Sequence, residues 1–368
     1  MQARSKPTLI GIQYLRGFAA LAVVFYHVFS NRVAQDWSSY RNFGIVGVDV
    51  FFIISGFIMW RTTSREAIPD PLSFLLRRAT RIYPAWWIAL TIWIVMRFVV
   101  PDRLHNADVN MWSVITSYAL APYYHSIFQG HVWPILVPGW TLELEILFYL
   151  LFAGTLWITS GPIRLVIIMT VLIGLSIAGV LHGVVNAFLE DLTSPLMLEF
   201  AAGIIVATQF SRLRALPSIV SAALLIVGVC LVGAFANLVT DDASGRALTL
   251  GSGATLIVAG VIGLENRLRT APMWGLLILG DASYSLYLTH PISISMAAFV
   301  WERLHLPTAS SPVAVFFVPL AMIVAVAVAL LFYWLIEIPL LERLTPSLRH
   351  RFSDVATDPG RQVRQTSS

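Results

Sequence analysis

The sequence predicts an all-α polytopic membrane protein with about ten transmembrane helices and both termini in the cytoplasm. Three features predict this: the composition, a series of long apolar segments, and the distribution of basic residues between them. Of the 368 residues, 57% are hydrophobic and only 12% are charged, whereas a soluble globular domain carries about 25% charged residues. The chain has one cysteine, which excludes an intrachain disulfide.

Ten apolar segments have roughly the length of a membrane span. About 20 apolar residues at ~1.5 Å rise per residue cross the ~30 Å hydrocarbon core as a helix. The segments are 10–30, 44–60, 82–100, 139–158, 164–185, 195–210, 218–236, 247–264, 274–298 and 312–336. No internal repeat and no separate soluble domain is visible among them.

Basic residues between the segments predict the orientation. If the N-terminus lies in the cytoplasm, 17 Lys and Arg residues fall on the inner side and 6 on the outer side, with Arg16 set aside. Because cytoplasmic loops carry the excess of Lys and Arg, both termini are expected in the cytoplasm. The net charge of +4 is therefore a sign of topology and does not indicate a nucleic-acid partner.

Two loops and the tail complete the domain organisation. The inner loop 61–81 begins a new amphipathic stretch at Pro71, and the outer loop 101–138 is rich in Trp, Tyr, His and Pro. Its part 112–128 favours an interfacial or re-entrant piece over a further span. We expect one membrane domain over residues 1–345 and a polar, disordered cytoplasmic tail over 346–368.

The first segment carries two ionisable residues within its apolar run, Arg16 and His27. They are eleven positions apart, so on a helix both side chains leave one face, separated by roughly 16 Å along the axis. Ionisable residues at membrane depth are costly and usually functional. The structural alternative is an arginine that snorkels to the interface and a histidine that is satisfied in the core.

Four ionisable residues lie at a similar predicted depth in the outer half of the membrane: His27, Asp49, Glu145 and His290. This pattern predicts a polar cavity that opens outwards, with a histidine base and carboxylates that orient it or balance its charge. The alternative is that Asp49 and Glu145 only form structural pairs with His290 or Arg97.

The inner loop ends in a cluster of arginines. On a helix, Arg81 is a neighbour of both Arg77 and Arg78, at i, i+4 and i, i+3. Guanidinium groups can hold pyrophosphate or phosphomonoester groups bidentately. The alternative is an anchor on anionic lipid headgroups, which makes membrane lipids the partner.

Other polar residues share helix faces with these groups. Ser283, Tyr287 and His290 lie on one face of the ninth segment, and Glu145 shares a face with Tyr149. Glu143 points about 200° away from Glu145, so the two carboxylates cannot form one acid–base pair. The histidines are scattered, so we expect no metal site.

Six short motifs in order make the sequence resemble the membrane acyltransferase-3 family, which includes O-antigen and exopolysaccharide acetyltransferases. YLRGFAALAVVFYH contains the family's Arg and His as Arg16 and His27, and LRRATRIYP contains its RxxR as Arg78 and Arg81. GVDVFFIISGFIM, GWTLELEILFY, LGDASYSLYLTHP and EIP match the remaining motifs. The residues within these motifs are most similar to those of the exopolysaccharide branch of the family.

The resemblance implies a multi-pass protein of the bacterial cytoplasmic membrane. The implied reaction is transfer of an acetyl or short acyl group from acyl-CoA, expected as acetyl-CoA, to a hydroxyl of a polysaccharide or lipid-linked glycan. GWTLELEILFY selects Glu145 over Glu143 as the family's carboxylate and adds Trp140 to the cavity. A homodimer is a further candidate partner.

In the mechanism expected from this resemblance, His27 is the general base or a transient nucleophile, and Asp49 or Glu145 fixes its tautomer. Arg78 and Arg81, with Arg77 beside them, hold the CoA phosphates. Arg16 orients the donor or stabilises an oxyanion.

Two alternatives stay open at this point. One is a transporter or flippase of a lipid-linked sugar, which composition alone fits equally well. The other is an acyltransferase for a small, macrolide-like acceptor.

Overall fold

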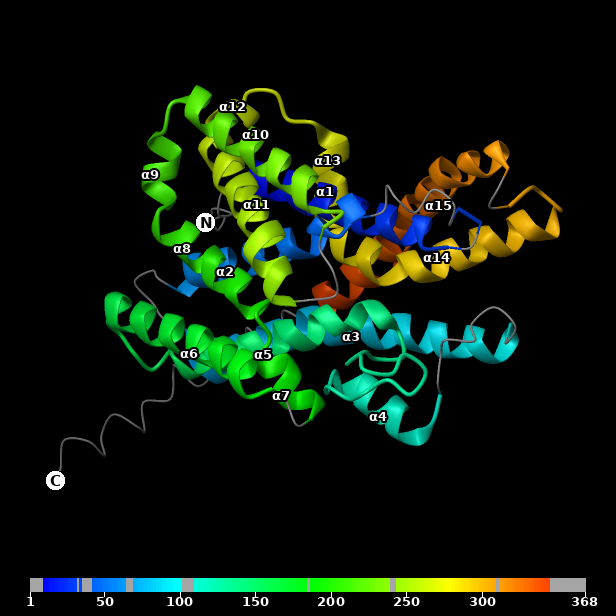
Figure 1. Ribbon diagram of the computed structural model, residues 1–368, viewed down its shortest axis with the longest axis horizontal. Coiled ribbons are helices and arrows are strands. Elements are labelled where there is room, and N and C mark those ends of the chain that lie inside the picture. Colours follow the sequence, from blue (N-terminus) through cyan, green and yellow to red (C-terminus); the bar gives the residue numbers. More distant parts are fainter. Residues whose placement is uncertain are drawn as a thin grey trace.

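The protein is helical throughout its described part, which confirms the predicted all-α class (Figure 1). The computed structural model describes residues 9–31, 33–34, 42–63, 69–100, 109–183, 186–238, 243–308 and 311–344. Within these ranges the only β-type pairing is an isolated antiparallel bridge between Tyr124 and Val132. The predicted tail 346–368 lies outside the described residues.

The α-helices follow the predicted segments closely. They are α1 Ile10–Phe29, α2 Val46–Thr63, α3 Pro71–Val99, α4 Met111–Ala119, α5 Trp140–Gly154, α6 Gly161–His182, α7 Ala187–Leu192, α8 Met197–Thr208, α9 Phe210–Ala215, α10 Ser218–Phe235, α11 Ala243–Gly263, α12 Glu265–Leu268, α13 Trp274–Asp281, α14 Ser283–Arg303 and α15 Phe317–Phe332. The short 3-10 turns Val137–Gly139 and Pro312–Phe316 precede α5 and α15, and the π-helical turn Tyr333–Glu337 follows α15.

Within the described ranges, nine helical segments are long and apolar enough to cross a membrane. They coincide with nine of the ten predicted segments, so the chain is a polytopic membrane protein. The cytoplasmic position of the termini stays a prediction. From the stretch 112–128, only α4 forms, and its nine residues rise ~14 Å, too short to span.

The remaining predicted segment, the ninth in order at 274–298, is not one continuous helix. The chain breaks at Ala282, between α13 and α14. The first half of α14 buries hydroxyls and an imidazole, among them Ser283, Ser285, Thr289 and His290. These polar groups lower the hydropathy of α14 and turn towards protein. A broken helix at membrane depth is tolerated where its free backbone groups line a cavity.

Helix α1 lies at the centre of the bundle, where it packs against α2, α11, α13, α14 and α15 (Figure 1). Its first turn is held by the Glu265 carboxylate, which accepts from the N–H of Ile10 at 3.0 Å and of Gly11 at 2.8 Å. A carboxylate at a helix N-terminus satisfies free donors and complements the helix dipole. The position of α1 therefore sets the position of Arg16 and His27.

Close packing of α2 on α8 depends on two glycines. A Cβ on Gly203 would lie 2.1 Å from the carbonyl oxygen of Ile53, and a Cβ on Gly56 would lie 2.1 Å from that of Phe200. Small residues let membrane helices approach backbone to backbone.

We therefore expect Gly203→Ala to destabilise the protein by about 1–3 kcal/mol, because α2 and α8 must separate to admit the methyl group. Thermal unfolding of the detergent-solubilised protein measures this. Gly174→Ala is the matched control, since a Cβ there meets no atom within 4 Å. Equal unfolding temperatures for the two variants would contradict the proposed packing.

Candidate active site

Two cavities lie between the central helices. We call the first the arginine cavity, formed by α1, α2, α3, α5 and α14. Its polar lining residues are Arg16, Ser55, Arg78, Arg81, Thr141, Glu145, Tyr149, Ser283, Tyr284 and Tyr287. We call the second the histidine cavity, which contains His27. It has a volume of about 700 Å³ against about 110 Å³ for the arginine cavity, so it is a chamber and the other is a slot.

The guanidinium groups of the arginine cavity come from α1 and α3. Arg16 Nη1 donates to Gln13 Oε1 at 3.1 Å, and Gln13 in turn donates to Asp281 Oδ1 at 2.9 Å. The Arg78 guanidinium lies 5.6 Å from the centre of the Phe74 ring and 5.8 Å from that of Tyr149. Its Nε is buried and makes no hydrogen bond. Fixed guanidinium groups with unused donors suit a phosphate ligand.

The three arginines of α3 that were predicted to bind phosphate, Arg77, Arg78 and Arg81, do not all face the same cavity. It begins at Pro71, with the Asp70 side chain capping the Ser73 N–H at 2.9 Å, so the arginine cluster lies within the helix. Arg78 and Arg81 line the arginine cavity, whereas Arg77 is exposed and does not line it. The prediction that Arg77 binds with them finds no support in this geometry.

Glu145 lies in the arginine cavity and not beside His27. It accepts hydrogen bonds from Ser55 Oγ at 2.8 Å and from the Tyr149 hydroxyl. The prediction of one pocket that joins Glu145 to His27 is therefore wrong. Counting residues from a helix end gives a depth, but the rotation of α5 turns this carboxylate towards α2.

Ser283 marks the end of the arginine cavity at the helix break. It is the first residue of α14, it is 1% exposed, and its hydroxyl has no hydrogen-bond partner. The N–H groups of the first turn of a helix lack intrahelical acceptors and favour an anionic or carbonyl oxygen. The broken helix thus adds donors to the slot that a continuous helix would not provide.

In the histidine cavity, one ring nitrogen of His27 is fixed by its own helix. Nδ1 lies 2.9 Å from the carbonyl oxygen of Val23. Because a carbonyl only accepts, Nδ1 carries the proton and the neutral ring keeps its lone pair on Nε2. A backbone carbonyl therefore fixes the tautomer, where the sequence predicted Asp49 or Glu145.

The His290 ring packs against the His27 ring but is not itself exposed to either cavity. The two ring centres are 4.6 Å apart, and His290 does not line either cavity. Its Nδ1 lies 2.7 Å from the Tyr287 carbonyl oxygen, while its buried Nε2 has no partner. Of the four residues predicted to share a layer, the structure brings these two histidines together.

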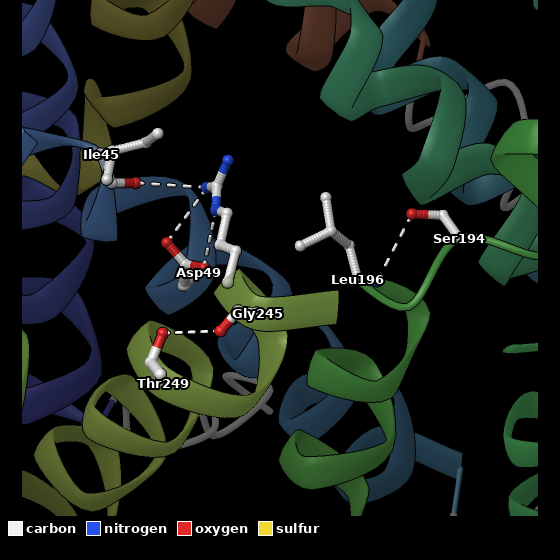
Figure 2. Close-up of polar contacts among 7 residues, drawn as sticks. Ile45, Asp49, Ser194, Leu196, Gly245 and Thr249 are labelled. Carbon is white, nitrogen blue, oxygen red and sulfur yellow. Dashed lines mark hydrogen bonds and ion pairs between the residues drawn. The ribbon is translucent and has the colours of Figure 1, made fainter. Parts of the chain in front are cut away.

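Asp49 forms a buried ion pair instead of contacting a histidine (Figure 2). Arg246 donates from Nε to Oδ1 and from Nη2 to Oδ2, both at 3.1 Å, and Asp49 is 0% exposed. Nη2 also lies 3.4 Å from the carbonyl oxygen of Ile45. Figure 2 shows Asp49 in the same view as Ser194 and Leu196, which line the histidine cavity together with Arg246. Asp49 thus forms a structural pair, with Arg246 as its partner in place of the predicted His290 or Arg97.

Tyr287 joins the two cavities. It and Val48 are the described residues that line both. The Tyr287 hydroxyl donates to the Pro138 carbonyl at 2.8 Å and lies 2.7 Å from Thr141 Oγ1. These bonds tie α14 to the start of α5 at the point where slot and chamber meet. Trp140, the other predicted cavity residue, lines the histidine cavity, with the Arg246 guanidinium 5.8 Å from its ring centre.

Sequence reasoning missed Arg246, Ser55 and Thr141. The predicted segment 247–264 leaves Arg246 just outside a membrane span, but α11 begins at Ala243. Serine and threonine are common in membrane helices, so no sequence pattern distinguished Ser55 or Thr141 as a site residue. Among the described residues, no group of three or more His, Cys, Asp or Glu could hold a metal ion.

Comparisons with known proteins agree with this architecture. An acyltransferase domain family matches residues 9–334. The exopolysaccharide production protein ExoZ of Rhizobium meliloti is 34% identical over 85% of this chain and 94% of its own length. The acyltransferase MdmB of Streptomyces mycarofaciens is 26% identical over 77% of this chain and 78% of its own.

A third relative, the putative membrane-bound transacylase BcsY of Komagataeibacter xylinus, is 32% identical over 38% of this chain and 34% of its own length. No solved structure matches the chain. The family match covers most of the described helices, including every residue that lines the two cavities. The chain belongs to the acyltransferase-3 family of membrane proteins and is an acyltransferase.

Proposed function

We propose that the protein is an O-acyltransferase of the bacterial cytoplasmic membrane. It moves an acetyl or short acyl group from cytoplasmic acyl-CoA to a hydroxyl of a cell-surface or exopolysaccharide sugar. The observation that carries the proposal is the junction at Tyr287 and Val48, where a slot lined by arginines meets a wide chamber lined by His27. Family membership removes the support for the transporter alternative.

The donor occupies the arginine cavity. The CoA phosphates bind Arg78 and Arg81 at its mouth, where Arg81 is exposed and Arg78 is half-buried. The extended arm of the donor runs past Arg16 and Ser283 towards Tyr287. The narrow slot suits a linear arm and excludes water from the thioester.

The acceptor enters the histidine cavity and reacts at its junction with the slot. His27 Nε2 removes the proton from the acceptor hydroxyl, and the oxygen adds to the thioester carbonyl. The carbon–sulfur bond then breaks, and the proton passes from the imidazolium to the departing thiolate, which leaves as the free thiol. Val23 and the neighbouring His290 hold the ring in the orientation that this transfer requires.

Glu145 takes no part as a partner of His27 in this scheme. Its carboxylate lies in the slot between Arg78 and the hydroxyls of Ser55 and Tyr149. It offsets the positive charge of the empty donor site and orients the hydroxyl groups that face the donor arm. Asp49 acts as a support for Arg246 and Trp140 on the acceptor side.

Transfer of radiolabelled acetyl from acetyl-CoA to extracted glycan, by the protein in proteoliposomes, tests the function. We expect Arg78→Ala to raise the donor concentration for half-maximal rate by about 10- to 100-fold, because a hydrogen bond to a charged group contributes roughly 1.5–3 kcal/mol. Arg77→Ala is the matched control, since Arg77 is exposed on the same helix and outside the slot.

Equal donor dependence in the Arg78→Ala and Arg77→Ala proteins would contradict the donor site. Glycan that crosses the bilayer without gaining label would contradict the reaction itself. Label that appears only on an added macrolide, and not on glycan, would shift the acceptor to a small molecule while the donor site remains.

A further inference from the structure

One wall of the histidine cavity is built from aromatic rings that the reaction scheme does not use. Trp133 lines the cavity together with His131, and the two rings stack with centres 4.2 Å apart and an interplanar angle of 12°. Phe128 contacts the same indole edge to face, with centres 5.2 Å apart. The indole is thus held between two rings in the loop that precedes α5. Together with Trp140 it presents fixed aromatic surface to the chamber.

The next part of the same wall is acidic. Glu190 and Asp191 of α7 line the cavity, and Asp191 is 9% exposed with an Oδ2 that has no hydrogen-bond partner. Burial raises the pKa of the Tyr124 phenol, and its hydrogen bond to Glu190 and the adjacent charges of Glu190 and Asp191 raise it further. A buried carboxylate oxygen without a hydrogen-bond partner is costly.

No positive charge on the described lining offsets these carboxylates. Arg246 is the one Lys or Arg among the described residues of this wall and chamber, and its guanidinium already binds Asp49 through two hydrogen bonds. Glu190 and Asp191 therefore give this wall acidic side chains beside the aromatic rings, with no described Lys or Arg free to neutralise them. Its volume of about 700 Å³ falls within the range of roughly 300–1,000 Å³ that is typical of ligand sites.

We propose that Trp133, Trp140, Glu190 and Asp191 form the acceptor subsite and that it selects an uncharged or amino-bearing pyranose over an acidic one. This rests on the proposed function and names the class of sugar that the histidine cavity takes. We call these four residues the pyranose wall.

A sugar ring matches both halves of the pyranose wall. The C–H groups on one face of a pyranose bury apolar area against an indole, and a fixed ring loses little entropy when it binds. Hydroxyls at the edge of the ring donate to carboxylates in charge-assisted hydrogen bonds. A uronate brings a like charge into a site of low dielectric constant, which opposes binding.

The wall also lies in the chamber where His27 can reach the bound sugar. His27, Trp140 and Asp191 line one continuous cavity. A pyranose held on the wall would direct one hydroxyl towards the imidazole while its other hydroxyls remain engaged. The wall therefore accounts for acceptor selection separately from proton transfer.

The test measures sugar binding without any acyl donor. The full-length protein in lipid nanodiscs is titrated with methyl β-glucopyranoside, methyl glucosaminide and methyl glucuronide, and saturation-transfer NMR reports binding. We expect the glucuronide to bind at least about ten-fold more weakly than the glucoside. In the isosteric double variant Glu190→Gln, Asp191→Asn, this difference should largely disappear.

Trp133→Ala should weaken binding of the uncharged glycoside by about 2- to 10-fold. Trp157→Ala is the matched control, because Trp157 is 75% exposed and lies outside both cavities. Retained binding of acetyl-CoA to each variant shows that it is folded.

The proposal is overturned if the glucuronide binds as tightly as the glucoside, if the double variant keeps the discrimination, or if Trp133→Ala binds like the Trp157→Ala control. These outcomes are independent of the reaction. A protein that discriminates the glycosides but transfers no label refutes the proposed function and keeps the pyranose wall. A protein that acylates glycan without discrimination refutes only the wall.

Discussion

We expect His27→Ala to lower the rate of acyl transfer by about 100- to 10,000-fold, the range that a positioned general base contributes. Its Nδ1 is committed to the Val23 carbonyl, so Nε2 is the atom available to the acceptor hydroxyl. The second imidazole, His290, does not line either cavity and cannot take over this contact directly. Initial rates of label transfer in proteoliposomes, at saturating acyl-CoA, measure the effect.

The matched control is His182→Ala, because His182 is exposed at the end of α6. Donor binding should be unchanged in His27→Ala, since the arginine cavity does not include His27. A variant with wild-type rate would remove His27 from the mechanism. An acyl group that stays on the wild-type protein after mixing with donor alone, and is absent from His27→Ala, would assign the nucleophilic role in place of the base.

The second large effect is expected on stability. Replacement of Arg246 by Ala should destabilise the fold by about 3–5 kcal/mol, because Asp49 would remain as a fully buried charge without its partner. The reverse change, Asp49→Ala, should cost a similar amount. Unfolding of the detergent-solubilised proteins, followed by near-ultraviolet circular dichroism, measures both.

The double variant Asp49→Leu, Arg246→Met decides between a structural pair and a catalytic aspartate. Removing both charges should cost clearly less than the sum of the two single changes, since neither group is left unpaired. If the losses add, the two residues are not coupled. If Asp49→Asn keeps wild-type stability but loses acyl transfer, Asp49 belongs to the catalytic machinery after all.

The sequence was a good guide to features that lie on a single helix. The apolar segments located the spans, and the spacing of Arg16 and His27 predicted two inward-facing polar positions on α1. The structure assigns each of them to its own cavity. Helix geometry has few free parameters, so position along one helix is predictable from residue number.

Contacts between helices were predicted less well. Glu145 and Asp49 were predicted from their depth along a helix, but depth does not specify how far a helix is rotated or tilted. Glu145 therefore met Ser55 and Tyr149, and Asp49 met Arg246. The helix break at Ala282 could not be predicted from the local sequence either, because alanine favours a helix. Its cause is tertiary: polar groups of α14 face protein, and the chain bends to place them.

The junction at Tyr287 has a consequence for the cell's energy supply. The bacterial cytoplasmic membrane, proposed here as the location, must hold an ion gradient, and two polar cavities joined end to end would form a water-filled leak for protons. The Tyr287 phenol, held by Pro138 and Thr141, lies at the point where the two cavities meet. In the proposed mechanism, passage of the acyl group and resistance to proton leakage must therefore be reconciled at this one side chain.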